Sequence, residues 1–171
     1  MKLVKEPDQG DKQEAWLARE RAHLSQVLYR YTPLVVDHAR GSYLYTVDGQ
    51  RYLDFASGIA VTNLGHGHPD VIKAAHAQLD KLVPLPGVAH PGPNIRLAER
   101  IAALAPGKLD KVFCSNSGAE AVEGAIKLAR YVTGRSAIVG FQGAFHGRTY
   151  GALSLTASKS YYRERYEPFL P

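Results

Sequence analysis

The chain has 171 residues, of which 45% are apolar, and this composition is typical of a folded protein and excludes a disordered one. Its 21 Lys and Arg residues outnumber its 16 Asp and Glu residues, and the excess is spread along the chain. This balance favours a site for small anions at least as well as a nucleic-acid surface.

Cys114 is the single cysteine, which excludes an internal disulfide and suits a reducing compartment. Its apolar neighbours predict a buried and unreactive thiol. The N-terminus has no apolar signal core, and no apolar run is long enough to span a membrane. We therefore expect a cytoplasmic protein with neither a membrane nor a nucleic acid as partner.

The first part of the chain predicts a helix followed by a small antiparallel sheet. Apolar residues recur at helical spacing over 12–28. Three runs rich in β-branched and aromatic residues follow, and Asp48-Gly49 between the last two is a strong hairpin signal. The runs cover 34–36, 43–47 and 51–55. A Gly-rich connection then leads to Pro69, which suits the first position of a helix that continues to about Leu82.

The second part predicts the start of a parallel α/β sheet. After a Pro-rich loop over 83–93, a helix begins at Pro93 and ends at Pro106-Gly107. Then come a strand over 110–115, a helix over 118–133 that stops at Gly134, and a second strand over 136–142. We assign 1–68 to an N-terminal helix and small sheet segment, and 69–171 to the start of a larger α/β domain. The last residues, 159–171, show no strand partner or helix cap, so we expect the chain to stop within that domain.

The turn between the first predicted strand and the helix after it has the composition of a phosphate site. Ser117 can cap the helix, and Glu120 three residues later completes a capping box. Gly118 would let an anion approach the unpaired amides of the first turn. The same residues also suit an ordinary helix start, and the motif alone leaves both interpretations open.

A second group of residues follows the second predicted strand. Phe145 could stack on a flat ring, and Arg148 could form a two-pronged pair with a carboxylate. The alternative is an aromatic side chain packed on the core and an arginine in solvent. Between them, His146 is expected to be structural. The pair His66 and His68 could suggest a metal site, but no third ligand has suitable spacing, so we expect no metal.

Four motifs together resemble the class III pyridoxal-phosphate aminotransferases, and the resemblance covers about residues 30–171. They are DFASGIAV at 54–61, GHGHP at 65–69, SNSGAEAVE at 115–123 and FHGRT at 145–149. The resemblance implies an α/β fold, namely the N-terminal segment and the first part of the large mixed or parallel-sheet domain of a fold-type-I pyridoxal-phosphate transferase.

The resemblance also implies roles for individual residues. The amides of Gly118 and Ala119 would hold the phosphate of pyridoxal phosphate, with Ser117 beside them. Phe145 would stack on the pyridine ring. Arg148 would bind the substrate carboxylate, and Ile59 would approach the substrate. For Glu123 we expect an ordinary i,i+4 pair with Lys127.

By the same resemblance, the full enzyme moves an amino group from an amino acid or ω-amine to a 2-oxo acid, and it is a homodimer. A donor like gamma-aminobutyrate is favoured, with an acetylornithine or ornithine type as the alternative. A lyase, racemase or decarboxylase on the same scaffold and an inert gene fragment are further alternatives. The Schiff-base lysine is expected beyond Pro171, so the chain holds no catalytic residue and is expected to be inactive alone.

Overall fold

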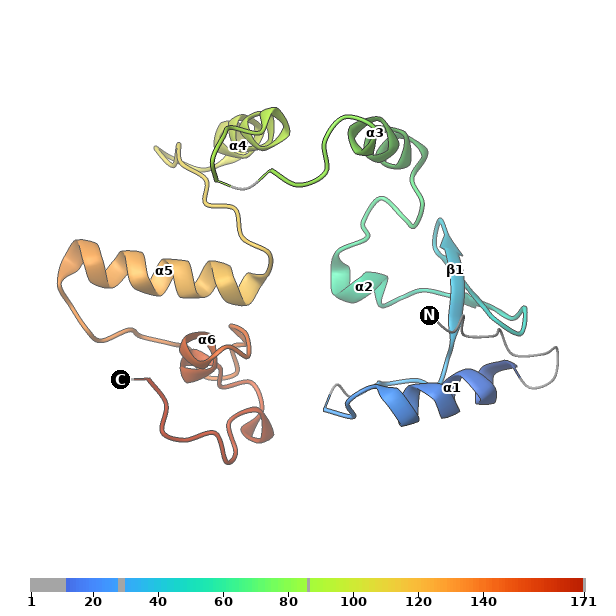
Figure 1. Ribbon diagram of the computed structural model, residues 1–171. Coiled ribbons are helices and arrows are strands. Elements are labelled where there is room, and N and C mark those ends of the chain that lie inside the picture. The colour runs from blue at the N-terminus through green and yellow to red at the C-terminus, as the bar shows by residue number, and fades with distance from the viewer. Residues whose placement is uncertain (1–11, 28–29, 86, 171) are drawn as a thin grey trace. The chain divides into compact units, whose positions relative to one another are not determined.

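The computed structural model describes residues 12–27, 30–85 and 87–170 (Figure 1). The chain divides into two compact units, Met1–Pro86 and Gly87–Pro171.

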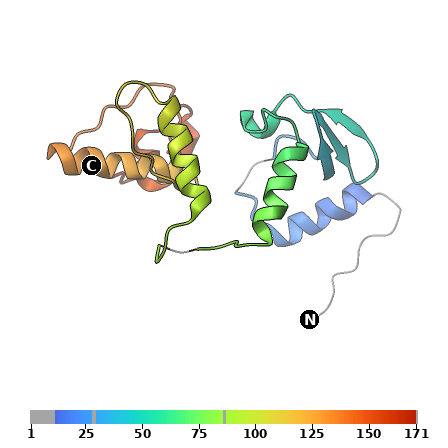
Figure 2. The same cartoon turned by 90° about the horizontal axis from the view of Figure 1, so that it is seen from above.

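The first unit contains the predicted helix and antiparallel sheet. Helix α1 (Lys12–His23) is followed by strands β1 (Val36–Arg40), β2 (Tyr43–Thr46) and β3 (Arg51–Leu53). The strands pair antiparallel in the order β1-β2-β3. Helix α1 runs beside this sheet (Figure 2), and Gln13 joins the two. Its Oε1 accepts from the amide of Val35 at 2.8 Å, and its Nε2 donates to Asp48 Oδ2 at 3.2 Å. The predicted sheet is therefore confirmed.

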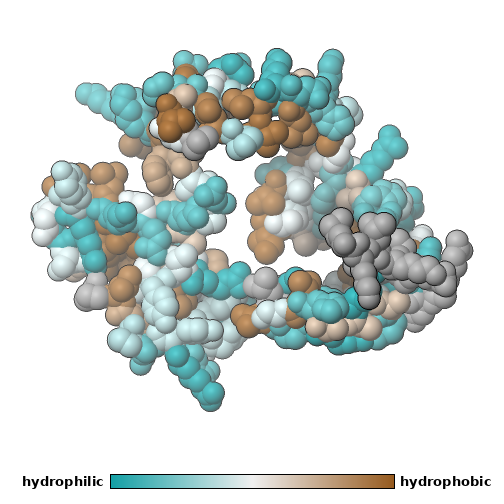
Figure 3. Space-filling view, viewed as in Figure 1, coloured by the Kyte–Doolittle hydropathy of each residue, from teal (hydrophilic) through white to brown (hydrophobic). Residues whose placement is uncertain are grey.

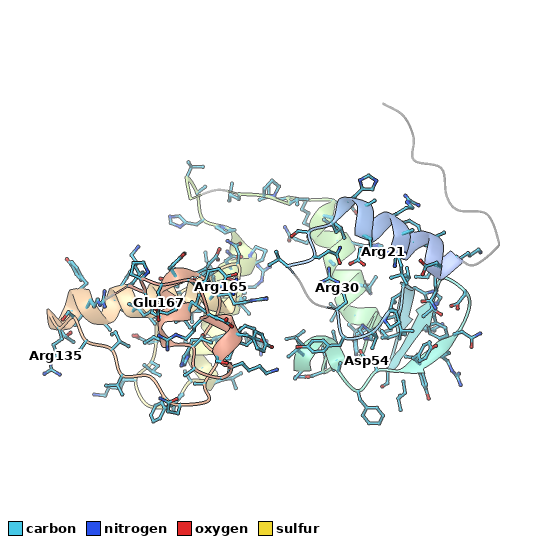
Figure 4. All side chains as sticks on the ribbon, turned by 90° about the horizontal axis from the view of Figure 1, so that it is seen from below. Arg21, Arg30, Asp54, Arg135, Arg165 and Glu167 are labelled. Atoms are coloured by element: carbon cyan, nitrogen blue, oxygen red, sulfur yellow. The ribbon has the colours of Figure 1, made fainter. Side chains whose placement is uncertain are left out.

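A left-handed turn replaces part of the predicted Gly-rich connection. This turn, α2 (Ser57–Ala60), has φ values of 48° at Ser57, 61° at Gly58, 65° at Ile59 and 61° at Ala60. A β-branched residue such as isoleucine rarely adopts this conformation. Asp54, labelled in Figure 4, supports the turn because its Oδ1 accepts from the amides of Ala56 and Ser57 at 2.9 and 2.8 Å.

The two histidines of the GHGHP motif both have structural partners. His66 Nε2 lies 2.7 Å from Asp54 Oδ2, so it braces the carboxylate that supports the turn. His68 is the N-cap of helix α3 (Pro69–Leu79), and its Nδ1 accepts from the amide of Asp70 at 3.3 Å. Pro69 is the first residue of this helix, as predicted.

The second unit contains helices α4 (Gly92–Leu104), α5 (Gly118–Thr133) and α6 (Tyr150–Leu155) and a short 3-10 helix, η1 (Ser160–Tyr162). Helix α5 packs on α6 (Figure 1). The buried residues of this unit lie in and beside α6, and they are Gly147, Gly151, Ala152, Leu153 and Thr156. Helix α5 ends at Gly134 in the left-handed conformation, with φ of 67°, and this predicted stop is confirmed.

Two predicted helices end earlier than expected, and other hydrogen bonds form around the end of each. Helix α1 ends at His23 rather than at Leu28, which lies outside the described residues. The side chain of Gln26 donates to the carbonyl of Leu24 there, which competes with helical bonding. Helix α3 ends at Leu79 rather than Leu82. The amide of Lys81 bonds to the carbonyl of Gln78 three residues earlier, as in a tighter 3-10 turn, and the side chain of Gln78 donates to the carbonyl of Leu82 at 2.9 Å.

The two predicted parallel strands are not formed. Among the described residues the only sheet is β1-β2-β3, and 110–115 and 136–142 belong to neither strand nor helix. A strand exists through pairing with a neighbour, and neither segment has one in the described ranges. Their apolar side chains are correspondingly exposed, with Phe113 at 72%, Val139 at 86% and Phe141 at 77%.

Other apolar side chains are also exposed on the surface (Figure 3). The same exposure overturns the prediction for Cys114, because this thiol lies on the unpaired segment and is exposed rather than buried.

Candidate functional site

The first turn of α5 leaves two backbone amides without a partner in the helix. Ser117 caps the helix, since its Oγ accepts from the amide of Glu120 at 3.2 Å. The carboxylate of Glu120 accepts from the amide of Asn116 at 2.6 Å, one residue earlier than in a standard capping box. The amides of Gly118 and Ala119 precede the first intrahelical bonds and stay available to an anion.

A hydroxyl buried in the second unit fixes the backbone around His146. Thr156 is fully buried, and its Oγ1 accepts from the amide of His146 at 3.0 Å and lies 3.0 Å from the carbonyl oxygen of Gly147. The sequence gives no sign of this role of Thr156, because His146 and Gly147 lie ten and nine residues before it. His146 is half-buried, and its backbone makes this contact.

Gly147 brings the loop after residue 144 into contact with α5. It is buried and has φ of 132°, and a Cβ placed on it would lie 2.7 Å from Ala119 Cβ. Normal carbon–carbon contacts are about 3.5–4.0 Å, so only glycine permits this approach. The loop that carries Phe145 and Arg148 is thereby held against Ala119, the second residue of α5.

These two segments form one pocket of about 520 Å³ within the second unit. Its walls come from the start of α5 and from the loop, and they consist of Gly118, Ala119, Val122, Phe145, His146, Gly147, Arg148 and Thr149. Four residues singled out in the sequence, Gly118, Ala119, Phe145 and Arg148, therefore line the same pocket. Ser117 precedes it in the chain but is not one of the lining residues.

The side chains of Phe145 and Arg148 have free surface at this pocket. Phe145 is 53% exposed and meets Tyr162 edge-on, with 5.4 Å between ring centroids, so one ring face is not covered by that contact. Arg148 is exposed and makes no hydrogen bond or ion pair with the described residues. An aromatic face, an unpaired guanidinium and two free amides can together bind a flat molecule that carries anionic groups.

Glu123 does not pair with Lys127, and this prediction was wrong. Its carboxylate instead accepts from the hydroxyl of Thr149 at 2.6 Å and from the amides of Gly151 and Ala152. The Thr149 hydroxyl is the main cause that holds the pKa of Glu123 below its ordinary value, and the two amides act in the same direction. Three donors outweigh one exposed lysine, whose pair would contribute only about 0.2–0.5 kcal/mol.

Ile59 belongs to the first unit, and its side chain is 86% exposed on the left-handed turn. Its approach to a substrate stays a prediction. In the described ranges, no three His, Cys, Asp or Glu side chains gather as a metal site would require. No helix among the described residues is both long and apolar enough to span a membrane.

Comparison with known proteins agrees with the family that the motifs resemble. Residues 25–171 match the Aminotransferase class-III family. The acetylornithine aminotransferase of Archaeoglobus fulgidus is 41% identical over 155 residues, which are 91% of this chain and 40% of that protein. The 5-aminovalerate aminotransferase DavT of Pseudomonas aeruginosa is 44% identical over 146 residues, which are 84% of this chain and 34% of that protein. The chain thus spans about two fifths of the length of these relatives.

Solved structures give the same result. An (S)-enantioselective omega-transaminase from Thermomicrobium roseum superposes with a TM-score of 0.82 and 33% identity, over 92% of this chain and 38% of that one. The ornithine aminotransferase of Toxoplasma gondii, in which pyridoxal phosphate partly occupies the active site, superposes with a TM-score of 0.76 and 27% identity, over 93% and 38% of the two chains. These neighbours are fold-type-I transaminases, so the predicted fold class is confirmed. The chain belongs to the class III aminotransferases, a pyridoxal-phosphate-dependent family.

Proposed function

We propose that this chain carries the phosphate-binding and ring-binding part of the pyridoxal-phosphate site of a transaminase. The observation that carries the proposal is the pocket of about 520 Å³, because one wall is the free start of α5 and the other is the loop with Phe145 and Arg148. The residues fit the cofactor, since Gly118 and Ala119 line the pocket and a Cβ placed on Gly118 would meet nothing within 4 Å, so this end of the helix is uncrowded. When bound, pyridoxal phosphate supplies the electron sink for amino-group transfer.

The start of α5 would hold the phosphate. The amides of Gly118 and Ala119 donate to its oxygens, and the positive end of the helix dipole adds to the attraction. The Oγ of Ser117 already accepts from Glu120, but its own hydrogen is free to be donated to the same phosphate. These three groups orient the cofactor by its phosphate and leave the ring to the opposite wall.

That opposite wall would hold the ring and the substrate. The free face of Phe145 stacks on the pyridine ring and excludes water from one side of it. Arg148 faces the substrate carboxylate with two parallel N–H donors, which fixes the direction of the molecule. For Ile59, which lies in the other unit, the family resemblance alone supports the proposal that it approaches the substrate.

The donor that best suits these residues carries a carboxylate at one end and a transferable terminal amine. Both gamma-aminobutyrate-like donors and acetylornithine have these two groups. The named relatives include acetylornithine aminotransferases and a 5-aminovalerate aminotransferase, and this favours acetylornithine or another five-carbon donor. A 2-oxo acid accepts the amino group, and the enzyme works as a homodimer.

We also infer that this chain does not turn over by itself. In the described part of the chain no lysine lines the pocket, so the group that must bind the cofactor covalently is not at hand. After mixing with pyridoxal phosphate and desalting, the purified 171-residue chain should retain no cofactor absorbance and show no transaminase activity. Measured turnover would show that one of its own lysines performs this task.

The phosphate site is tested by Gly118→Val in the full-length protein that contains this sequence, with Gly87→Val as the matched control. A Cβ at either glycine meets nothing within 4 Å, so neither change should disturb the fold. Only Gly118 lies in the pocket, and a branched side chain there would block the amides. Losing one charged hydrogen bond costs about 1.5–3 kcal/mol, which is roughly a 10- to 150-fold loss of affinity. Equal affinities for pyridoxal phosphate in titrations of the two apo-proteins would contradict the proposal.

A further inference from the structure

Glu123 joins the helix that starts the pocket to the segment that closes it. Its Oε1 accepts from Thr149 Oγ1 at 2.6 Å, from the amide of Gly151 at 2.9 Å and from the amide of Ala152 at 3.2 Å. Thr149 is the N-cap of α6 but makes no capping bond with its own side chain. The carboxylate of Glu123 therefore takes the place of the cap and satisfies two amides of the first turn of α6.

The approach of this carboxylate depends on a glycine. A Cβ placed on Gly151 would lie 2.2 Å from Glu123 Oε2, which is far inside contact distance. Gly151 is buried, so a side chain at this position would displace the carboxylate from the amide. Lys127 is the charged group among the described residues that acts on Glu123, and it adds a weak attraction that also favours the ionised carboxylate.

We propose that Glu123 is a positioning residue for the ligand-binding loop 145–149. The carboxylate holds Thr149, next to Arg148 in the chain, at a fixed distance from the start of α5. On the other side of the loop, Gly147 rests on Ala119. Together these contacts fix Phe145 and Arg148 relative to the amides at the start of α5. Glu123 therefore sets how the cofactor ring and the substrate carboxylate lie relative to the cofactor phosphate. This inference rests on the proposed function of the pocket.

Three variants of Glu123 separate positioning from simple charge. Glu123→Gln keeps an oxygen that can accept from the same three donors. Glu123→Asp keeps the charge but is one methylene too short to reach them, and Glu123→Ala leaves the amides without a partner. Glu99→Gln is the matched control, because Glu99 is exposed on α4 and lies outside the pocket. We expect the affinity of Glu123→Gln for pyridoxal phosphate to stay within about threefold of that of the parent protein, whereas Glu123→Asp and Glu123→Ala should bind it roughly tenfold or more weakly.

Two readouts test position in the full-length protein containing this sequence. The first is circular dichroism of the cofactor band at saturating pyridoxal phosphate, which reports ring orientation once binding is complete. This band should change in Glu123→Asp and Glu123→Ala and be unchanged in Glu123→Gln and in the Glu99→Gln control. The second is amide hydrogen exchange of the apo-protein over 149–156, which should become faster in Asp and Ala only.

These readouts also separate the possible failures. Parent-like dichroism and exchange in Glu123→Asp would overturn the positioning role, and this test stands even if Glu123→Ala does not fold. A Glu123→Gln variant as impaired as Glu123→Asp would overturn it too, because an acceptor oxygen of the right reach would then not be enough to hold the loop. If the parent protein binds no pyridoxal phosphate, the proposed function fails, and unchanged exchange in the variants would show that Glu123 does not hold the loop either.

Discussion

Gly147→Ala should separate α5 from the loop that carries Phe145. A Cβ at Gly147 would lie 2.7 Å from Ala119 Cβ and 3.0 Å from Ala152 Cβ, at a buried position. Overpacking of this kind costs about 1–3 kcal/mol. The φ of 132° is also unfavourable for alanine, which adds about 1–3 kcal/mol. We therefore expect Gly147→Ala to lower the free energy of unfolding by about 2–6 kcal/mol.

Gly143→Ala is the control that isolates the packing part of this loss. Gly143 also has a positive φ, 76°, but a Cβ there meets nothing within 4 Å. It should lose only the backbone part, about 1–2 kcal/mol. Chemical denaturation followed by far-ultraviolet circular dichroism measures both variants, with pyridoxal-phosphate affinity as a second readout. Equal losses in the two variants would refute the reasoning, because the close contact between Gly147 and Ala119 would then carry no energy.

Three further predictions concern single side chains. Arg148→Ala should lower kcat/KM for a carboxylate substrate roughly 10- to 150-fold and leave cofactor affinity unchanged, and Arg148→Lys should recover only part of the lost kcat/KM. Steady-state kinetics and a cofactor titration of each variant test this, and a fall in cofactor affinity instead of kcat/KM would contradict the prediction. Thr156→Val should lower the free energy of unfolding by about 1–3 kcal/mol, because the amide of His146 loses its acceptor, whereas Thr156→Ser keeps the hydroxyl and should lose less. Thermal melts in which Thr156→Ser is less stable than Thr156→Val would refute this prediction. The hydrogen bond from His66 is the main cause that holds the pKa of Asp54 below 3.8, so the ionised Asp54 stabilises the fold above pH 3.8 and this stability is lost as the pH falls through the lowered pKa. In denaturation experiments between pH 5 and pH 2, Asp54→Asn should therefore lose less stability than the parent protein. Equal losses in the two proteins would contradict the prediction.

The features that could be predicted from sequence are those set by contacts within about four residues. Ser117 and Glu120 form a helix cap because the cap needs only their spacing. Gly134 stops α5 for a similarly local reason, since a left-handed residue is needed there. Asp48-Gly49 made the hairpin predictable in the same way. The resemblance to the family then turned the possible roles of Phe145 and Arg148 into specific proposals, namely contacts with pyridoxal phosphate and with the substrate carboxylate.

The features that were missed depend on residues distant in the chain. The strands expected over 110–115 and 136–142 were inferred from apolar runs, but a run of suitable residues forms a strand only where a neighbour offers its backbone. The left-handed turn at Ile59 was hidden because a β-branched residue is a poor candidate for that conformation. The signal that could have revealed it was Asp54 followed by the small residues Ala56, Ser57 and Gly58, since an aspartate often bonds to backbone amides two or three residues later.

Glu123 shows why a local rule can give the wrong partner at a ligand site. The i,i+4 pair with Lys127 is worth about 0.2–0.5 kcal/mol on an exposed helix face. Hydrogen bonds from neutral donors to a charged group contribute about 1.5–3 kcal/mol each, so three donors from residues 26 to 29 positions away prevail as soon as the fold brings them near. Glycine at 151 makes that approach possible, and glycine at 147 makes the matching approach to Ala119 possible. The two glycines and the glutamate therefore act as one set, in which the missing side chains let the loop come close and the carboxylate keeps it there.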